Sequence, residues 1–310
     1  MLYRRMMLVL AVSALTTVAN PAEAWAAPAM VDQATWNSTK KSVTLSNGLK
    51  VAYVEAGNPN GEPLLLLHGY TDSSRSWSLM APYLAKYRLL IPDQRGHGGS
   101  DAPECCYSLS QFAFDAKLFL DALGIKQAAV VGHSLGSMVA ITMAAEYPDR
   151  VRSITLIGST ALVPVERGGW LYDNALALKG PLDPNSQFGK DWHPANQPTA
   201  VDPAFAEAVN EEILRIPLHV WHSVMRELAS TPVGRHSADV KAPVLVLSGG
   251  KDPLFTAEHH RSLLVAFPKA DAHVYPELGH NPNWERPAEV AAKIDAFLAS
   301  SHNVIELNRE

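Results

Sequence analysis

The stretch of sequence that decides the fold is AAVVGHSLG, residues 128–136, in which a serine stands between two glycines. An apolar run leads into this Gly-x-Ser-x-Gly motif, and a helical pattern follows it directly. Such a setting is typical of a nucleophile elbow, a sharp turn between a strand and a helix that carries a reactive serine. The start of the helix also directs free N–H groups toward developing negative charge. We therefore predict that Ser134 is a nucleophile rather than an ordinary loop serine.

The alternation of apolar runs and helical patterns continues on both sides of this turn. Short apolar runs, typical of strands buried on both faces, lie at residues 64–67, 88–91, 128–131, 153–157, 244–247 and 273–275. Helical patterns lie at residues 110–123, 135–147 and 287–299. Strands that alternate with helices form βαβ units. The expected fold class is therefore α/β, with a mostly parallel sheet flanked by helices.

Two segments depart from this alternation. Residues 42–47 and 49–56 alternate apolar and polar side chains around Asn47-Gly48, which predicts an antiparallel hairpin. Residues 160–238 show no good strand pattern and are dominated by helical spacing, which predicts an inserted helical cap. The expected organisation is an N-terminal extension at residues 27–41, a core at 42–159 and 239–300, the cap at 160–238, and a fraying acidic tail at 301–310.

The composition fits a globular protein with a sizeable core. A chain of 310 residues, 47% of them hydrophobic, can hold one large α/β domain or two modest ones. The net charge of −5 leaves no basic surplus, so we expect no nucleic-acid partner. The 12 histidines do not cluster with cysteines and carboxylates at the spacing of metal ligands. We expect neither a metal nor an organic cofactor.

The first residues have the pattern of a secretory signal peptide. Two arginines precede an apolar run at residues 6–18, and small residues follow at Ala22, Ala24 and Ala26. The run is shorter than the roughly 20 residues that span a bilayer, which disfavours a membrane anchor and stable membrane insertion. We expect a signal peptide at residues 1–26 and export to the periplasm or out of the cell, by a route that the sequence leaves open.

The only cysteines, Cys105 and Cys106, are adjacent in the chain. Neighbouring cysteines cannot join distant parts of a fold, so the hydrophobic core must carry the stability. A bond between them would close a small, strained ring. Two free thiols are therefore the favoured expectation.

Two residues beyond the later predicted strands complete a catalytic triad. A serine nucleophile needs a general base, and the base needs a third group that fixes its tautomer. His280 follows the last apolar run, and Asp252 follows the run at residues 244–247. The chain order Ser, Asp, His is the order expected for an elbow of this kind. We predict His280 as the base and Asp252 as its orienting acid.

An oxyanion formed at the substrate carbonyl needs preorganised N–H donors. We expect these donors to be Leu135, next to the nucleophile, and Tyr70, in the loop after residues 64–67. Weaker candidates for the substrate pocket are His68, His133 and Trp221, although His68 is expected mainly to shape its loop. Four further cap side chains could line the site or pack the helices: Trp170, Trp192, His219 and His222.

Taken together, the motifs resemble the α/β-hydrolase superfamily, in its capped branch. The matches, in chain order, are His68-Gly69, residues 93–100 (DQRGHGGS), the elbow, Gly250-Lys251-Asp252 and Gly279-His280. The resemblance spans about residues 42–300. It implies an eight-stranded, mostly parallel sheet, a cap after the sixth strand and a structural turn at residues 93–100. One departure is Ser137, where relatives often have a second glycine.

The resemblance also narrows the reaction. Relatives that are dehalogenases or epoxide hydrolases use an aspartate at the elbow, so Ser134 argues against both activities. A serine suits acyl transfer through an acyl-enzyme. We expect a hydrolase of carboxylic esters, or of lactones, whose partner is a small or medium apolar molecule. The alternatives are a hydrolase of carbon–carbon bonds next to a ketone and a cofactor-free haloperoxidase or amidase, all with the same triad, and a non-catalytic ligand-binding protein. The oligomeric state is left open.

Overall fold

The computed structural model describes residues 29–307, and the predicted signal peptide lies outside the described residues. Eight strands form one sheet in the order β1-β2-β4-β3-β5-β6-β7-β8. Their bounds are β1 Lys41–Thr44, β2 Lys50–Gly57, β3 Pro63–Leu67, β4 Arg88–Pro92, β5 Ala128–His133, β6 Val151–Ile157, β7 Val244–Gly249 and β8 Asp271–Tyr275. The pairs β1–β2 and β2–β4 are antiparallel, and the other pairs are parallel. The predicted α/β fold class and its eight-stranded sheet are confirmed.

Helices cover both faces of the sheet because its central strands are apolar on both sides. Along β3, Leu65 and Leu67 join the core cluster that includes residues of α1 (Leu109–Ala122) and α2 (Leu135–Glu146). The alternate residues of that strand, Leu64 and Leu66, join the cluster that includes α9 (Pro287–Leu307). Successive side chains of a strand point to opposite faces, so a continuous apolar run holds two helical layers.

The last helix is longer than predicted. We expected its helical pattern to end at residue 299 and the tail to fray from residue 301, whereas α9 continues to Leu307. Residues 300–307 contain neither glycine nor proline, the residues that most often stop a helix. We expected this segment to fray because it is polar, but polar residues alone do not end a helix.

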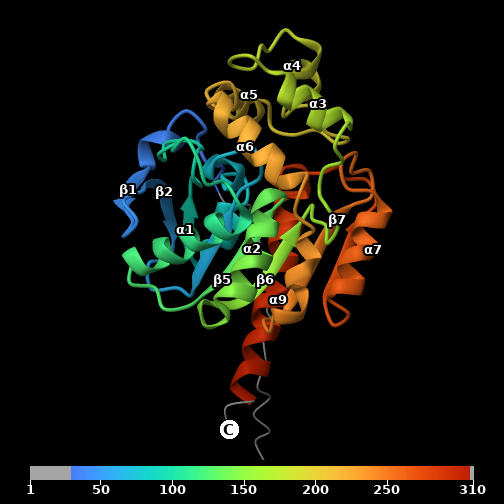
Figure 1. The fold of residues 1–310 in the computed structure, drawn as a ribbon. Helices are drawn as coiled ribbons and strands as arrows, with labels where there is room; N and C mark the ends of the chain where they lie inside the picture. Colours follow the sequence, from blue (N-terminus) through green and yellow to red (C-terminus); the bar gives the residue numbers. More distant parts are fainter. Residues whose placement is uncertain (1–28, 308–310) are drawn as a thin grey trace, which may run out of the picture.

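Between β6 and β7 the described chain contains helices and no strand. These helices are α3 (Trp170–Ala177), α4 (Gln187–Asp191), α5 (Pro203–Ile213), α6 (Leu218–Leu228) and the 3-10 segment η6 (Val233–Asp239). Figure 1 shows α3, α4, α5 and α6 together beyond one end of the sheet, in the upper part of the view. On α6, Val220, Trp221 and Val224 are fully buried. An insertion with this arrangement can roof a site at the sheet edge.

A buried ion pair joins α5 of the cap to the loop after β3. Arg75 Nε lies 2.8 Å from Glu212 Oε1, and both side chains are less than a tenth exposed. The hydroxyl of Ser73 also donates to Glu212. Arg75 Nη1 donates to the carbonyl oxygen of Gln33 at 2.7 Å, and Asn37 Nδ2 donates to Glu212 at 2.9 Å. One cap helix is thus connected both to the core and to the segment before β1.

The two cysteines are joined, contrary to expectation. Cys105 and Cys106 form a disulfide in the loop between β4 and α1. Cys106 has a positive φ of 74°. The bond was not expected from sequence because its ring is small, and the positive φ of Cys106 is the backbone conformation in which the ring closes. Across residues 29–307, no helix has both the length and the apolarity that crossing a bilayer requires.

Candidate active site

Ser134 lies at the sharp turn between β5 and α2. Its backbone has φ 49° and ψ −118°, a conformation that non-glycine residues rarely adopt. The two flanking glycines make this turn possible: a Cβ on Gly132 would collide with the carbonyl of Gly136, and one on Gly136 would collide with the carbonyl of Leu67. Ser137 adds to the turn, since its hydroxyl lies 2.6 Å from the carbonyl oxygen of Ser134. The serine side chain is thereby held at the edge of the sheet.

Asp252 and His280 form a buried pair beside this turn. Nδ1 of His280 lies 2.8 Å from Oδ2 of Asp252. The other carboxylate oxygen accepts hydrogen bonds from the backbone N–H groups of Leu254 (2.8 Å) and Phe255 (2.9 Å). Burial alone would raise the pKa of Asp252, but the charge and hydrogen bond of His280, with the two N–H donors, hold that pKa below its ordinary value. The acid is therefore kept as a carboxylate, which orients the imidazole.

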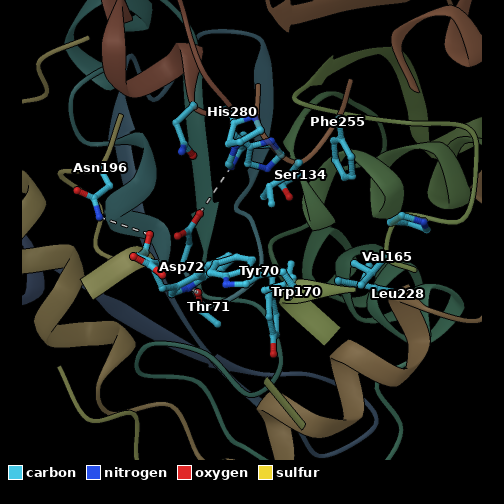
Figure 2. Close-up of a pocket in the computed structure, with 18 of the residues that line it drawn as sticks. Tyr70, Thr71, Asp72, Ser134, Val165, Trp170, Asn196, Leu228, Phe255 and His280 are labelled. Atoms are coloured by element: carbon cyan, nitrogen blue, oxygen red, sulfur yellow. Dashed lines mark hydrogen bonds and ion pairs between the residues drawn. The ribbon is translucent and has the colours of Figure 1, made fainter. Parts of the chain in front are cut away.

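The other nitrogen of that imidazole is available for chemistry. Nε2 of His280 is buried and has no hydrogen-bond partner among the described residues. His280 and Ser134 line the same cavity, and Figure 2 shows their side chains next to each other. The structure thus brings the three predicted triad residues to one place, and Nε2 of His280 remains without a partner in the described part of the chain, at the cavity that Ser134 also lines.

The two predicted oxyanion donors lie at the ends of neighbouring strands. Leu67 of β3 pairs with Gly132 of β5, so the loops that carry Tyr70 and Leu135 leave the sheet at the same edge. Leu135 is the first residue of α2, where a backbone N–H has no partner within the helix. The hydroxyl of Tyr70 donates to the carbonyl oxygen of Trp221 at 2.7 Å, and burial raises the pKa of Tyr70 well above its ordinary value. Tyr70 therefore connects this loop to α6.

A cavity of about 600 Å³ opens above the triad, between core and cap. One part of its wall is apolar and includes Met138, Val165, Leu228 and Phe255. Another part is polar and includes Asp72, His133, Asn196, Gln197 and Asn281. In Figure 2, Ser134 lies between Val165 and Leu228 on one side and Asp72 and Asn196 on the other.

The comparison with known proteins agrees with this geometry. The sequence matches the model of a family described as alpha/beta hydrolase fold over residues 62–287, well over half of the chain. The chain belongs to the α/β-hydrolase family. The predicted resemblance is confirmed.

Several relatives are hydrolases. Lipase 1 of Psychrobacter immobilis is 31% identical over 273 residues, which cover 83% of this chain and 83% of that lipase. The 2-hydroxy-6-oxo-6-phenylhexa-2,4-dienoate hydrolase of Burkholderia cepacia is 27% identical over 272 residues, 80% of this chain and 92% of that enzyme. A thermophilic esterase from Thermogutta terrifontis has the same fold, with a TM-score of 0.71 at 23% identity over 85% of this chain and 99% of that one. The family and the two sequence relatives support hydrolase activity, and the likeness to the esterase structure shows the fold.

A second carboxylate–imidazole pair lies in the cavity of this α/β hydrolase. Nδ1 of His133 is 3.6 Å from Oδ2 of Asp72, too far for a hydrogen bond. The other ring nitrogen of His133 lies 3.1 Å from the carbonyl oxygen of His280. Asp72 Oδ2 accepts from the N–H of Gly69 at 3.2 Å. The pair therefore links the oxyanion loop to the loop of the predicted general base.

Two of the weaker pocket candidates, His68 and Trp221, do not line the cavity, and the hydrogen bonds of His68 agree with the expectation that it mainly shapes its loop. His68 is fully buried, and its Nε2 accepts from the N–H of Gln94 at 2.9 Å. Trp221 is also fully buried, and its ring packs at 5.3 Å from that of Tyr70 and 6.0 Å from that of Phe188. Neither residue lines the cavity, because each side chain points into packed surroundings. His133, the third candidate, does line it.

Of the four cap side chains left open by the sequence, Trp170 and Trp192 line the cavity, whereas His219 and His222 do not. Sequence reasoning missed Asp72, Val165, Leu228 and Phe255. A signal existed only for Asp72, a carboxylate in the predicted oxyanion loop. The three apolar residues resemble the other apolar residues of their segments. Among the described residues, no group of three or more histidine, cysteine or acidic side chains could hold a metal ion.

Proposed function

We propose that this protein is an exported serine hydrolase that cleaves carboxylic esters, or lactones, of small or medium apolar molecules. The observation that carries the proposal is the 2.8 Å contact between His280 Nδ1 and Asp252, which leaves the buried Nε2 of His280 without a partner beside Ser134. A hydrogen-bonded Nδ1 sets the tautomer in which Nε2 accepts a proton. That is the arrangement a serine nucleophile requires.

The proposed reaction has two steps. Ser134 Oγ attacks the ester carbonyl while its proton passes to Nε2 of His280, and the carbonyl oxygen becomes an oxyanion that the N–H groups of Tyr70 and Leu135 stabilise. Collapse of this intermediate breaks the ester bond, and the leaving oxygen takes the proton from His280. Water then attacks the acyl-enzyme in the same way, giving a carboxylic acid and free Ser134.

Other features support the scope of this proposal. The apolar part of the cavity wall, with Met138, Val165, Leu228 and Phe255, suits an acyl chain or ring. The name of the lipase from Psychrobacter immobilis points to ester cleavage in a relative. Export rests on the signal-peptide pattern in residues 1–26.

The test is the hydrolysis of a chain-length series of nitrophenyl esters by the purified chain and by Ser134→Ala, with a metal chelator present. We expect turnover by the parent, a loss of at least about 1,000-fold in kcat in the variant, and a preferred acyl length.

A parent that cleaves no ester but opens dienoate ketones would favour the carbon–carbon hydrolase, which the relative from Burkholderia cepacia suggests. Binding of such compounds without any turnover would favour a ligand-binding protein.

A further inference from the structure

The polar part of the cavity wall holds a carboxylate, Asp72, and an imidazole, His133, whose facing atoms are not hydrogen-bonded to each other. Nε2 of His133 faces the carbonyl oxygen of His280 at 3.1 Å, and a carbonyl can only accept. In the neutral imidazole, Nε2 therefore carries the hydrogen and Nδ1 presents a lone pair. Nδ1 of His133 is buried, with the residue 2% exposed, and it has no hydrogen-bond partner among the described residues.

The neighbouring carboxylate has the same need. Oδ2 of Asp72 accepts from Gly69 N and from the hydroxyl of Ser76, whereas Oδ1 accepts nothing from the described residues. Asp72 and His133 both line the cavity, 3.6 Å apart at Nδ1 and Oδ2. Gly69 packs closely against the pair, since a Cβ there would lie 2.8 Å from Oδ2 and 2.9 Å from Nδ1. Two adjacent acceptors call for a ligand that donates hydrogen bonds.

The place of this pair identifies the part of the substrate that it would contact. In the proposed reaction, the leaving oxygen takes its proton from Nε2 of His280, so the leaving alcohol must lie on the side of His280. His133 contacts the backbone of that residue, and Asn281, which follows it in the chain, lines the cavity and donates to Gln197 at 3.0 Å. The polar wall is thus next to the leaving alcohol.

The charges of the cavity wall indicate which polar groups are acceptable. Among the described lining residues, the carboxylates are Asp72, Glu166 and Asp191. Carboxylates repel an anionic ligand and attract a neutral donor or a cation. The acyl part of the substrate would lie on the other side of Ser134. There the N–H of Val165 donates to the carbonyl oxygen of Leu228, which brings these two apolar residues together (Figure 2).

We propose that the substrate is an ester of an apolar acid with a hydroxylated, non-anionic alcohol, whose second hydroxyl donates a hydrogen bond to the Asp72–His133 pair. This inference rests on the proposed ester hydrolysis and specifies its substrate class. It assigns to Asp72 and His133 a role in substrate selection that the triad does not have.

The experiment compares esters that share one acyl group and differ only in the alcohol. Propyl hexanoate and 2-hydroxyethyl hexanoate are nearly isosteric, with a methyl group in place of a hydroxyl, and carboxymethyl hexanoate carries a carboxylate there. We expect kcat/KM of the parent to be roughly tenfold to a hundredfold higher for the 2-hydroxyethyl ester than for the propyl ester. The carboxymethyl ester should be the poorest of the three.

The variants Asp72→Asn and His133→Phe test the assignment through the ratio of the two uncharged esters, in which a general loss of catalysis cancels. Both should bring that ratio to within about threefold of one. Glu166→Gln is the matched control, because it removes the charge of another cavity carboxylate, one that follows Val165 in the chain, and it should leave the ratio unchanged.

A parent that cleaves nitrophenyl and propyl hexanoate well but shows no preference for the hydroxyl overturns this inference and leaves the esterase proposal standing. A ratio unchanged in Asp72→Asn and His133→Phe overturns it as well. A parent that cleaves no ester overturns both proposals.

Discussion

The core and the cap meet at one cavity and contribute to it in different ways. The core supplies groups that are buried and held by several hydrogen bonds, such as Asp252, which is 8% exposed and accepts from two backbone N–H groups as well as His280. The cap supplies side chains such as Trp170, which is 47% exposed. The groups proposed for chemistry are thus fixed by the fold, whereas exposed cap side chains at the cavity can be exchanged at little cost to the fold.

The largest difference between core and cap is expected when one carboxylate is changed in each of them. Asp252→Asn should lower kcat for a nitrophenyl ester by about 1,000- to 10,000-fold, because an amide favours the wrong tautomer of His280. Asp191→Asn, in the cap, should change kcat by less than about threefold, because its carboxylate is exposed at the cavity wall. Equal losses in the two variants would contradict the division of roles.

Trp221 and Trp170, both in the cap, should differ in their contribution to the free energy of unfolding. Trp221→Ala should lower the free energy of unfolding by about 3–5 kcal/mol, because it empties a fully buried site among aromatic rings. This reverses the expectation from sequence that Trp221 selects substrates. Trp170→Ala should cost less than about 1 kcal/mol. Urea unfolding of both variants measures the difference, and similar losses would show that the exposed ring is also structural.

The pH dependence of unfolding tests the lowered pKa of Asp252. Since the pKa of Asp252 is lower in the folded protein than in the unfolded chain, ionised Asp252 stabilises the fold above the unfolded value of about 3.9. This contribution is lost as the pH falls through the lower, folded value. We therefore expect the stability difference between the parent and Asp252→Asn to shrink as the pH falls from about 5 to below about 4. A constant difference down to the most acidic pH would contradict the lowered pKa.

The smallest effect is expected for selectivity at the cap. Trp170→Ala should change the ratio of kcat/KM between long and short acyl esters by roughly threefold to tenfold, because a half-exposed ring offers only part of its face to the substrate. The rates of the two esters in the parent and the variant give the ratio. An unchanged ratio would mean that Trp170 lines the cavity without touching the acyl group.

The same division explains how much the sequence predicted. The strand β5, Ser134 and the start of α2 were placed within two residues, because the glycines of an elbow and a continuous apolar run are local signals. Asp252 and His280 could be proposed because each follows a predicted strand, and the structure places them 2.8 Å apart. In the cap, Trp170 and Trp221 have the same side chain in the same insertion, yet one lines the cavity and the other is buried. Only tertiary packing separates them, so no local pattern could.

The buried ion pair between Arg75 and Glu212 bears on how such a cap could be replaced by one from a relative. A foreign cap without an equivalent carboxylate would leave the guanidinium of Arg75 without its ionic partner inside the protein, which costs about 3–5 kcal/mol when one member of such a pair is lost. A working chimera would need a carboxylate in the foreign cap at the position of Glu212. Alternatively, it would need a mutation of Arg75 in the core. The part of this protein that must be exchanged together is therefore the cap plus its docking residue Arg75 in the core, not the inserted segment alone.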